Sequence, residues 1–434
     1  MANPRQIAFQ ALLKTEKDGA FSNLALDAVL SKSDLDTRDK SFVSNLFYGV
    51  IERQLTIDYN LSLYLTKPLK KLKPEVLTIM RAGAYQILFM DKVPDSAAVN
   101  ESIKLSKKIS AAYASGLINA VLRKISVNGL VLPKDTDSTE YLSIKYSCPL
   151  WLTEKWSAEY GRENAIRLLE ASVGSADTFI RVNTTKTTDD DLIEKFLSEG
   201  VTAEKTYNEN ALKISLRGND IEKLASFKSG LFHVQDMASQ LCAKALGATE
   251  NDIVFDLCSA PGGKAYTVCE MMKDKGKVLC FDIYENRVSL ILKGAERLAL
   301  TSIEGRVGDA SVYNEALGLA DKVLCDVPCS GLGIIRRKPE IKYKKQEELA
   351  GLPDIQFSII CNAARYVKKG GRLLYSTCTL SKAENEDVCS RFLDANKEFM
   401  PVGVFSQDDE CMKTLMPHIN ESDGFFIACF RREV

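Results

Sequence analysis

Histidine is scarce in this sequence. His233 and His418 are the only two, and the 12 cysteines include no CxxC pair. Zinc sites need closely spaced cysteine and histidine ligands, so no metal site is expected. No apolar stretch approaches the roughly 18 residues that a membrane-spanning helix requires, and the N-terminus is charged throughout, unlike a secretion signal. These absences predict a cytoplasmic protein without a membrane anchor.

The cysteines could be structural or chemically active. An even count could indicate disulfides, but a long chain without an export signal is not typical of disulfide-stapled proteins. Most cysteines in such a protein are small buried hydrophobes. A chemically active cysteine needs an accessible, electropositive site, so position in the fold must decide which ones react.

Charge is nearly balanced, with a net value of −1, and excludes no partner by itself. The distribution is uneven: residues 1–145 hold 20 lysines and arginines against 15 acids. A basic N-terminal part permits contact with RNA without requiring it.

The length of 434 residues predicts more than one domain. Residues 1–130 show apolar residues at helical spacing, with Pro74 suited to the first turn of one helix. Residues 127–140 are rich in turn formers and acids and resemble a linker. Residues 141–235 mix short helices and strands, which indicates a small α/β module. Residues 236–434 form the third predicted domain.

In the third domain, short apolar strands alternate with helical stretches. Strand–helix alternation predicts βαβ units, a doubly wound parallel sheet and ligands at the carboxyl ends of the strands. The four candidate strands are 252–258, 277–282, 321–327 and 371–378.

The first of these strands runs into the sequence SAPGGK. Gly262 and Gly263 allow the backbone to approach a ligand closely, yet the pattern is neither GxGxxG nor GxxxxGK[ST], so no phosphate cradle is expected. Asp282 ends the next strand, where an acid can bind ribose hydroxyls, and Asp309 lies where a loop could reach an adenine. A glycine turn, a ribose acid and no phosphate site together favour S-adenosylmethionine. The alternative is an incidental glycine pair in an ordinary strand–turn–helix.

Two cysteines fall at strand ends on the predicted ligand side. Cys329 follows Asp326 by three residues in DVPCSG, and Cys378 lies in STCTL. A thiolate that adds to carbon 6 of cytosine makes carbon 5 nucleophilic enough to accept a methyl group, which is covalent catalysis. A carboxyl group would hold the ring, and a nearby cation such as Lys264 would favour the thiolate.

A basic segment follows the first of these cysteines. Residues 336–345 contain Arg336, Arg337, Lys338, Lys342, Lys344 and Lys345 against a single acid, Glu340. We interpret it as an RNA-contacting segment that neutralises phosphates beside the pocket. The alternative is a solvated surface loop.

Taken together, these motifs resemble the Nol1/Nop2/Sun family of RNA cytosine-5 methyltransferases over roughly residues 145–434. The shared features are LCSAPGGK, Asp282, Asp309 in a GDA context, DVPCSG, YSTCTL with Glu384 and Asn385, and the closing DGFFIACFRR. Ser259 stands where the family usually has alanine. The resemblance implies a Rossmann-like class I methyltransferase domain that uses S-adenosyl-L-methionine.

The resemblance also assigns roles to individual residues. Cys378 would be the nucleophile, Cys329 would assist product release, and Asp326 would contact the target base and the cofactor region. The residues that would hold the cofactor are Cys258, Ser259, Ala260, Pro261, Gly262, Gly263, Lys264, Asp282, Asp309 and Asp326.

The N-terminal region resembles NusB-like RNA-binding domains in TRDKSFVSNLFYGVIERQLTID and in DSAAVNESIKLSKKISAAYASGLINAVLRKI. A NusB-like domain joined to this catalytic domain implies 16S ribosomal RNA as substrate, with a ferredoxin-like middle module helping to hold RNA. We expect a monomer with no DNA or membrane partner.

Other functions remain as alternatives. The same chemistry could act on another RNA such as tRNA, or the chain could be a non-catalytic RNA-binding assembly factor, although the intact motifs oppose this. A DNA cytosine-5 methyltransferase would not be expected to carry Cys378 as a second cysteine. An amino-group methyltransferase would place Asn/Asp-Pro-Pro-aromatic where this chain has Asp326 to Cys329.

Overall fold

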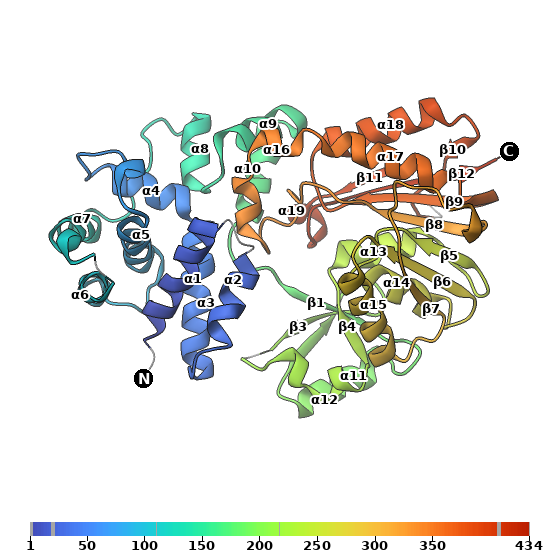
Figure 1. Cartoon of the computed structure of the whole chain (residues 1–434), viewed down its shortest axis with the longest axis horizontal. Helices are drawn as coiled ribbons and strands as arrows, with labels where there is room; N and C mark the ends of the chain where they lie inside the picture. Colours follow the sequence, from blue (N-terminus) through green and yellow to red (C-terminus); the bar gives the residue numbers. More distant parts are fainter. Residues whose placement is uncertain (1–2, 19–21, 110, 217, 406–408, 434) are drawn as a thin grey trace. The chain divides into compact units, whose positions relative to one another are not determined.

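A computed structural model describes residues 3–18, 22–109, 111–216, 218–405 and 409–433 of the chain (Figure 1). The chain divides into two compact units. The helical unit comprises Met1–Gly174 and Ile335–Lys344, and the sheet unit comprises Ser175–Ile334 and Lys345–Val434. The domain bounds 1–130, 141–235 and 236–434 stay a prediction.

The helical unit confirms the helices predicted for the N-terminal region. Pro74 occupies the first turn of its helix, where a missing N–H costs nothing. Asp36 and Ser138 each accept a backbone N–H at a helix start. The helices are α1 (Pro4–Asp18), α2 (Ser22–Leu30), α3 (Thr37–Glu52), α4 (Gln54–Ser62), α5 (Pro74–Phe89), α6 (Asp95–Lys108), α7 (Ser115–Asn128), α8 (Thr139–Lys145), α9 (Leu150–Tyr160) and α10 (Arg162–Ala171), with short 3₁₀ turns at η1 (Leu69–Lys71), η2 (Ala112–Ala114) and η5 (Pro339–Tyr343).

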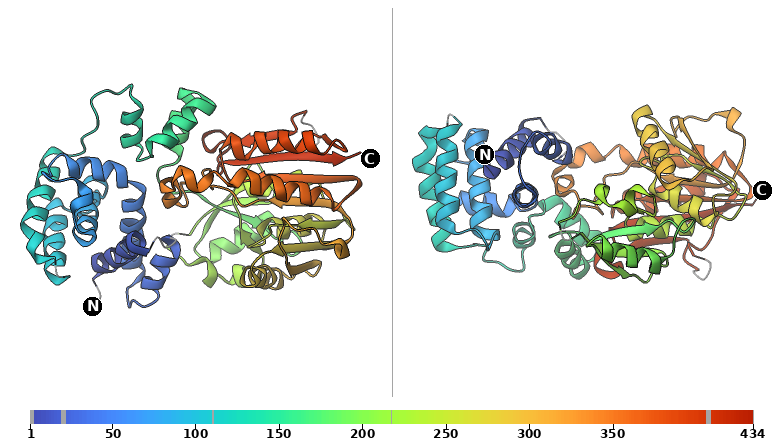
Figure 2. Two further views of the ribbon diagram at one scale, coloured as in Figure 1. Left: turned by 45° about the horizontal axis from the view of Figure 1, so that its top comes forward. Right: turned by 90° about the horizontal axis from the view of Figure 1, so that it is seen from below.

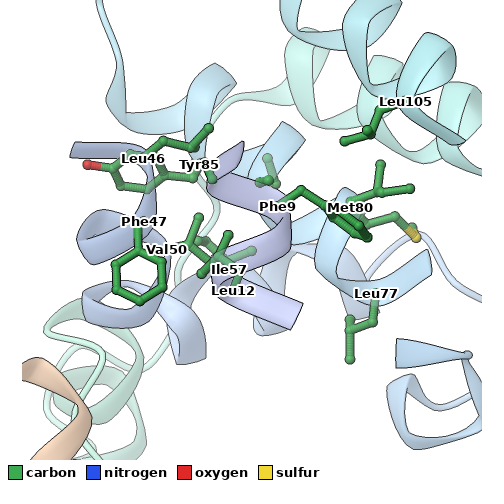
Figure 3. Close-up of a cluster of buried hydrophobic side chains, with 14 of the residues drawn as sticks. Phe9, Leu12, Leu46, Phe47, Val50, Ile57, Leu77, Met80, Tyr85 and Leu105 are labelled. Atoms are coloured by element: carbon green, nitrogen blue, oxygen red, sulfur yellow. The ribbon is translucent and has the colours of Figure 1, made fainter. Parts of the chain in front are cut away.

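A single apolar core holds the first seven helices together (Figure 3). Helix α1 packs against α3 and α5, and α5 packs in turn against α6 and α7. Burial of these side chains is the main force that orders the helices, because isolated helices of this length are marginal in water. The labelled core residues are Phe9, Leu12, Leu46, Phe47, Val50, Ile57, Leu77, Met80, Tyr85 and Leu105.

The sheet unit begins with a small antiparallel sheet in the order β2-β3-β1-β4. Its strands are β1 (Thr178–Val182), β2 (Thr202–Lys205), β3 (Ala211–Ser215) and β4 (Phe232–Val234), and its helices are α11 (Asp189–Ser198) and α12 (Ala225–Lys228). Leu192 and Phe196 of α11 join Ile180 and Leu212 of the sheet in one apolar cluster. The mixture of short helices and strands expected for residues 141–235 is confirmed.

The large sheet has the strand order β10-β12-β9-β8-β5-β6-β7, with β11 paired to β12. The five strands from β9 to β7 are parallel to their neighbours, and β12 runs antiparallel to β9. The strands are β5 (Ile253–Asp256), β6 (Lys277–Asp282), β7 (Ile303–Val307), β8 (Ala320–Asp326), β9 (Val367–Thr377), β10 (Phe399–Pro401), β11 (Met412–Leu415) and β12 (Phe425–Arg432). All four candidate strands are thereby confirmed, as is the closing strand.

Helices cover both faces of this sheet (Figures 1 and 2). Successive side chains of a strand point to opposite faces, and both faces are buried here, which explains the continuous apolar strands. Val254 lies in the cluster with α13, α14 and α15, whereas its neighbour Phe255 lies in the cluster with α17 and α18. The covering helices are α13 (Met237–Ala245), α14 (Gly263–Met271), α15 (Glu285–Leu298), α17 (Leu352–Ala364) and α18 (Glu386–Ala395). The remaining short elements of the sheet unit are η3 (Ile221–Lys223), which packs on α12, and η4 (Glu315–Leu317), α16 (Gln346–Leu349), η6 (Lys382–Glu384) and α19 (Pro417–Asn420).

The segment Ile335–Lys344 belongs to the helical unit, although it follows the Cys329 motif in sequence. The Lys342 side chain is fully buried, and its Nζ donates to the Glu52 backbone oxygen at 2.7 Å. Tyr343 Oη donates to the Ile51 oxygen at 2.9 Å. The expectation that Lys342 contacts RNA phosphates is therefore wrong, because its ammonium is enclosed by the helices.

Within the described residues, no helix is long and apolar enough to cross a membrane.

Candidate active site

Five parallel strands of the large sheet end at one edge, and this edge carries most of the sequence-predicted site. Strands β6 and β8 flank β5, so the chain order reverses beside β5. Ligands of open α/β sheets bind at such a reversal, outside the carboxyl ends of the strands. Asp256, Asp282 and Asp326 are the last residues of β5, β6 and β8.

The two motif cysteines lie side by side at this edge. Cys329 Sγ and Cys378 Sγ are 3.3 Å apart. Their loops follow β8 and β9, which are neighbours in the sheet with Asp326 opposite Ser376. The separation is well beyond the S–S bond length of about 2.05 Å, and both cysteines are free and partly accessible. The pairing that the motifs suggested is thus present in the fold.

A buried carboxylate holds the loop of Cys329 against the segment after Cys378. Glu384 accepts the backbone N–H of Ser330 at 2.8 Å and the Ser330 hydroxyl at 2.6 Å. Gln356 Nε2 also donates to Glu384, at 3.0 Å, and to the Pro328 oxygen. The Ser330 hydroxyl lies 2.7 Å from Thr379 Oγ1. Together these bonds fix both cysteine loops to one anchor.

Backbone contacts tighten the same arrangement. Gly333 N–H donates to the Cys378 oxygen at 3.0 Å, and Gly424 N–H donates to the Gly333 oxygen. A Cβ at Gly333 would come within 2.0 Å of the Gly424 oxygen. Glycine is required there because the backbones approach too closely for any side chain. Glu384 stood in the sequence motif, but its anchoring role could be seen only in the fold.

Asp326 and Lys264 form an ion pair beside the cysteines. Lys264 Nζ lies 2.6 Å from Asp326 Oδ2, and the Ser376 hydroxyl donates to Asp326 Oδ1 at 2.9 Å. Burial opposes the charge on Lys264, but attraction to Asp326 outweighs it and raises the lysine pKa. Cys378 also lies close enough for a negative charge on its sulfur to raise the pKa of Lys264. A cation therefore lies close to the Cys378 sulfur.

Cys329 lies in surroundings that oppose a negative charge on its sulfur. Contact with Cys378, followed by burial, raises the pKa of the Cys329 thiol well above its usual range. Cys329 therefore stays protonated at neutral pH and can donate its S–H. Burial likewise raises the pKa of the Cys258 thiol.

The glycine turn after β5 has the predicted form. Ser259 N–H donates to the Phe281 oxygen of β6 at 2.8 Å, and Gly262 N–H donates to the Ser259 oxygen at 2.7 Å. Gly262 has φ +107, a conformation that side chains disfavour, and a Cβ there would meet Tyr266 Oη at 2.4 Å. Helix α14 starts at Gly263, so its N-terminus faces the sheet edge where a ligand would bind.

The two further acids of the predicted cofactor site are differently engaged. Asp282 is buried, accepts the Tyr284 N–H at 3.1 Å and pairs with Arg287 at 3.1 Å. Asp309 is exposed and accepts both the N–H and the hydroxyl of Ser311, which lowers its pKa. Asp282 lies at the end of β6, and Asp309 in the loop after β7, as the strand order predicts.

Asp256 was not singled out by the sequence. Its side chain is 1% exposed, and burial raises its pKa to about 7, with a contribution from the nearby Asp326. Perturbed carboxyls of this kind cluster at functional sites. The sequence signal was only its place at the strand end, three residues before Ser259. Among the described residues, no group of three or more acids, histidines or cysteines could hold a metal ion.

Comparison with known families finds matches in three parts of the chain. Three family models match: the 16S rRNA methyltransferase RsmB/F over residues 243–431, the NusB family over residues 2–127, and the ferredoxin-like domain of RsmF/B-like methyltransferases over residues 148–219.

Curated relatives match over nearly their whole length. A probable ribosomal RNA small subunit methyltransferase B from Bacillus subtilis is 35% identical, covering 99% of this chain and 98% of the relative. Its Synechocystis counterpart is 31% identical, with complete coverage of both chains.

Solved structures agree with the sequence matches. The crystal structure of PH0851 is 26% identical with a TM-score of 0.84, covering 100% of this chain and 99% of that one. A methyltransferase homologue from Pyrococcus horikoshii has a TM-score of 0.60 and 26% identity, covering 69% and 99%.

Fold and site together define a Rossmann-like methyltransferase preceded by a NusB domain and a ferredoxin-like domain. The chain belongs to the RsmB/F family of 16S rRNA methyltransferases.

Proposed function

We propose that the protein methylates carbon 5 of a cytosine in small-subunit (16S) ribosomal RNA, with S-adenosylmethionine as methyl donor and a cysteine as covalent nucleophile. One observation carries the proposal: two thiols lie 3.3 Å apart at the ligand edge of the sheet, beside an ion pair. Carbon 5 of cytosine is too weak a nucleophile to react directly. Addition of a thiolate to carbon 6 overcomes this by dividing one difficult step into easier ones.

Two acids that follow the strands next to the glycine turn suit S-adenosylmethionine. The carboxylates of Asp282 and Asp309 accept hydrogen bonds, and the hydroxyl and amino groups of an adenosine can donate them. The cofactor has no phosphate, and the sequence has no phosphate-binding glycine motif. Residues Cys258–Lys264 with Asp282, Asp309 and Asp326 would hold it. When bound, it supplies an electrophilic methyl group on a sulfonium centre.

Cys378 Sγ is the nucleophile in this proposal. Lys264 lies close enough to attract a negative charge on this sulfur, and in the proposed step the thiolate forms a bond to carbon 6 of the base. Asp326, held by Lys264 and Ser376, is placed to accept a hydrogen bond from the exocyclic amine of the cytosine and so to orient the ring. After carbon 5 takes the methyl group, it loses its proton to a base, and the Cys378 sulfur leaves carbon 6.

Cys329 assists that last step. Its thiol is protonated at neutral pH and lies 3.3 Å from the departing sulfur. An S–H donor at this distance stabilises the thiolate that forms as the bond to carbon 6 breaks. The two cysteines therefore have separate roles, one in forming the adduct and one in resolving it.

The choice of RNA rests on the relatives. The curated proteins that match this chain along its length are named as ribosomal RNA small subunit methyltransferases, so 16S ribosomal RNA is the proposed substrate and another RNA such as tRNA is the alternative. The basic N-terminal part favours an RNA partner of either kind.

The proposal is tested with Cys329→Ala and Cys378→Ala, each mixed with S-adenosylmethionine and 16S ribosomal RNA. We expect Cys329→Ala to accumulate a slowly migrating protein–RNA adduct on a denaturing gel and Cys378→Ala to form none. Bisulfite sequencing of RNA treated with wild type then locates the methylated cytosine. The partly buried Cys361 of α17 provides the control, and Cys361→Ala should behave as wild type.

Three results would contradict the proposal in different ways. An adduct in Cys378→Ala and none in Cys329→Ala would exchange the roles of the two cysteines. Methylation by wild type with no adduct in either variant would remove the covalent step. Methylation of tRNA in preference to 16S RNA would change the substrate and leave the chemistry intact.

A further inference from the structure

Two long stretches of the helical unit contain no acidic residue. Residues 59–74 hold four lysines, and residues 102–134 hold five lysines and one arginine, with no aspartate or glutamate in either stretch. Acids are common around them, since residues 1–145 contain 15. Cations at a protein surface are normally interspersed with acids, because like charges repel one another. Two acid-free stretches in one folded unit therefore point to an anionic partner outside the chain.

The fold brings the two stretches together. The first stretch contains the connection 63–73 between α4 and α5, and the second contains α7. Lys124 Nζ of α7 lies 5.9 Å from the ring centroid of Tyr64, and Lys73 Nζ lies 5.2 Å from the ring centroid of Tyr113, directly before α7. A cation over an aromatic ring is attracted to it. The connection is thus attached to the second stretch near both of its own ends.

The same connection presents its lysines to solvent. Leu65, Leu69 and Leu72 are half-buried and pack against the core of the helical unit. Because these leucines fix the backbone, the lysines between and beside them form a rigid charged surface. The lysines of the connection are all exposed, and they are Lys67, Lys70, Lys71 and Lys73.

The second stretch adds further cations to this surface. Helices α6 and α7 pack side by side (Figure 1). Lys107 and Lys108 are exposed at the end of α6, five residues before Tyr113, and Lys124 is exposed in α7. We call the surface formed by seven of these residues the lysine face. Its members are Lys67, Lys70, Lys71, Lys73, Lys107, Lys108 and Lys124.

The acids directly before the two stretches are paired with cations outside the lysine face. Asp58 pairs with Arg81 at 2.7 Å, inside the helical unit. Glu101 pairs with Lys104 at 2.8 Å, one turn along α6. Seven lysines therefore share the lysine face without an acid from either stretch.

We propose that the lysine face binds the phosphate backbone of the ribosomal RNA substrate, at nucleotides other than the target cytosine. The inference rests on the RNA substrate assigned under the proposed function. A fixed array of ammonium groups matches a chain of phosphates, and binding releases the counterions of the RNA. Contacts to phosphate carry no sequence information, so the face adds affinity without choosing the nucleotide. The leucines of the connection point to the core, which favours a polyanion over a lipid surface.

The experiment reverses three charges of the connection in the triple variant Lys67→Glu, Lys70→Glu, Lys71→Glu. Filter binding measures the affinity of the full chain for 16S ribosomal RNA between about 50 and 200 mM salt. Each lost phosphate contact lowers the salt slope by about 0.7–0.9, so the slope should fall by about 2–3 and the affinity at low salt by at least about tenfold. In methylation assays, KM for the RNA should rise by a similar factor, with kcat within about twofold of wild type.

The control reverses three exposed cations of the same unit in the triple variant Lys32→Glu, Arg38→Glu, Lys40→Glu. Acids stand between these cations, so they form no continuous positive surface. The change in total charge is the same, and RNA affinity should stay within about twofold of wild type. Urea unfolding followed by tryptophan fluorescence checks that the helical unit is intact, since both tryptophans lie in α9.

A milder variant guards against damage from the new acids. Lys67→Ala, Lys70→Ala, Lys71→Ala removes the charges alone, and its salt slope should fall as that of the glutamate variant does. Its affinity at low salt should lie between those of the wild type and the glutamate variant, because alanine does not repel phosphate.

The outcomes separate the inference from the function on which it rests. Wild-type affinity and salt slope in both lysine-face variants would overturn the inference and leave the proposed function intact, and loss of binding to phosphatidylserine vesicles instead would assign the face to a membrane. An equal loss in the control variant would overturn it too, because total charge would then govern binding. If the wild type binds 16S RNA through the face but methylates none of it, the proposed function fails and the binding surface stands.

Discussion

Lys342 Nζ donates a 2.7 Å hydrogen bond to the backbone oxygen of Glu52, inside the helical unit and away from solvent. Burial lowers the pKa of Lys342 to about 8. The ordinary value is 10.5, so the unfolded chain binds more protons than the folded one between about pH 8 and 10.5. By linkage, the free energy of unfolding of the helical unit should rise as pH increases through this range.

The variant Lys342→Met tests this dependence of the free energy of unfolding on pH. The lowered pKa corresponds to a cost of about 3 kcal/mol for keeping the charged Lys342 in the folded chain at neutral pH. Methionine removes this cost, but it also removes the hydrogen bond to Glu52, which contributes about 1 kcal/mol. We expect the variant to be more stable than wild type at pH 7, with no pH-dependent gain from this residue above pH 8. Urea unfolding followed by tryptophan fluorescence is suitable, since both tryptophans, Trp151 and Trp156, lie in α9. A variant that is less stable at pH 7 would contradict the prediction.

The anchor at Glu384 should matter for catalysis more than for cofactor binding. In Glu384→Gln an NH2 donor replaces either Oε1, which accepts the Ser330 hydroxyl, or Oε2, which accepts both the Ser330 N–H and Gln356 Nε2. Loosening of the Cys329 loop should lower kcat by about ten- to a hundredfold, because misplaced catalytic groups lose much of their effect. Affinity for S-adenosylhomocysteine should stay near wild type.

Single-turnover methylation and calorimetric titration measure these two quantities separately. Asp387→Asn, an exposed acid in α18, serves as the control and should leave both unchanged. A parallel fall in cofactor affinity and rate would show that Glu384 supports the whole edge of the sheet instead of the cysteine loops.

Asp256 should make the sheet unit less stable at alkaline pH. Its pKa is raised from 3.8 to about 7, so the folded chain binds more protons than the unfolded chain between these values. The stabilising contribution of the protonated acid is complete below about pH 4 and is lost as pH rises to 7. Asp256→Asn removes this dependence and should raise stability at pH 8 by up to about 4 kcal/mol.

Native-state hydrogen exchange of the β5 and β8 amides, without cofactor, gives the local stability. At pH 4 the variant and wild type should differ little, and this provides an internal control. A variant equally destabilised at both pH values would indicate that the carboxyl group makes structural contacts that an amide cannot replace.

Gly262 should be sensitive to the smallest substitution. Alanine there would adopt φ +107 and bring Cβ within 2.4 Å of Tyr266 Oη. Strain in this region costs about 1–3 kcal/mol, and distortion of the turn should weaken S-adenosylhomocysteine binding at least tenfold. Gly351, with open space around it, is the matched control. Gly351→Ala should bind the ligand as wild type does, and equal losses in both variants would refute the proposed function of the turn.

Much of the site could be predicted from the sequence because its residues follow strand ends. Parallel strands bring their carboxyl ends to one edge, so Asp282, Asp326, Cys329 and Cys378 were expected on the same side of the sheet. The helices and strands could also be predicted from the sequence, because the spacing of apolar residues indicates which face of each element is buried.

Tertiary structure alone decided the rest, because it depends on contacts between residues far apart in the chain. Lys342 belongs by sequence to a basic surface segment, yet its ammonium is buried against Glu52, 290 residues earlier. Glu384 has no sequence signal that separates an anchor from an ordinary polar residue. A hydrogen-bond partner, or the lack of one, is a property of the packed core and not of local sequence.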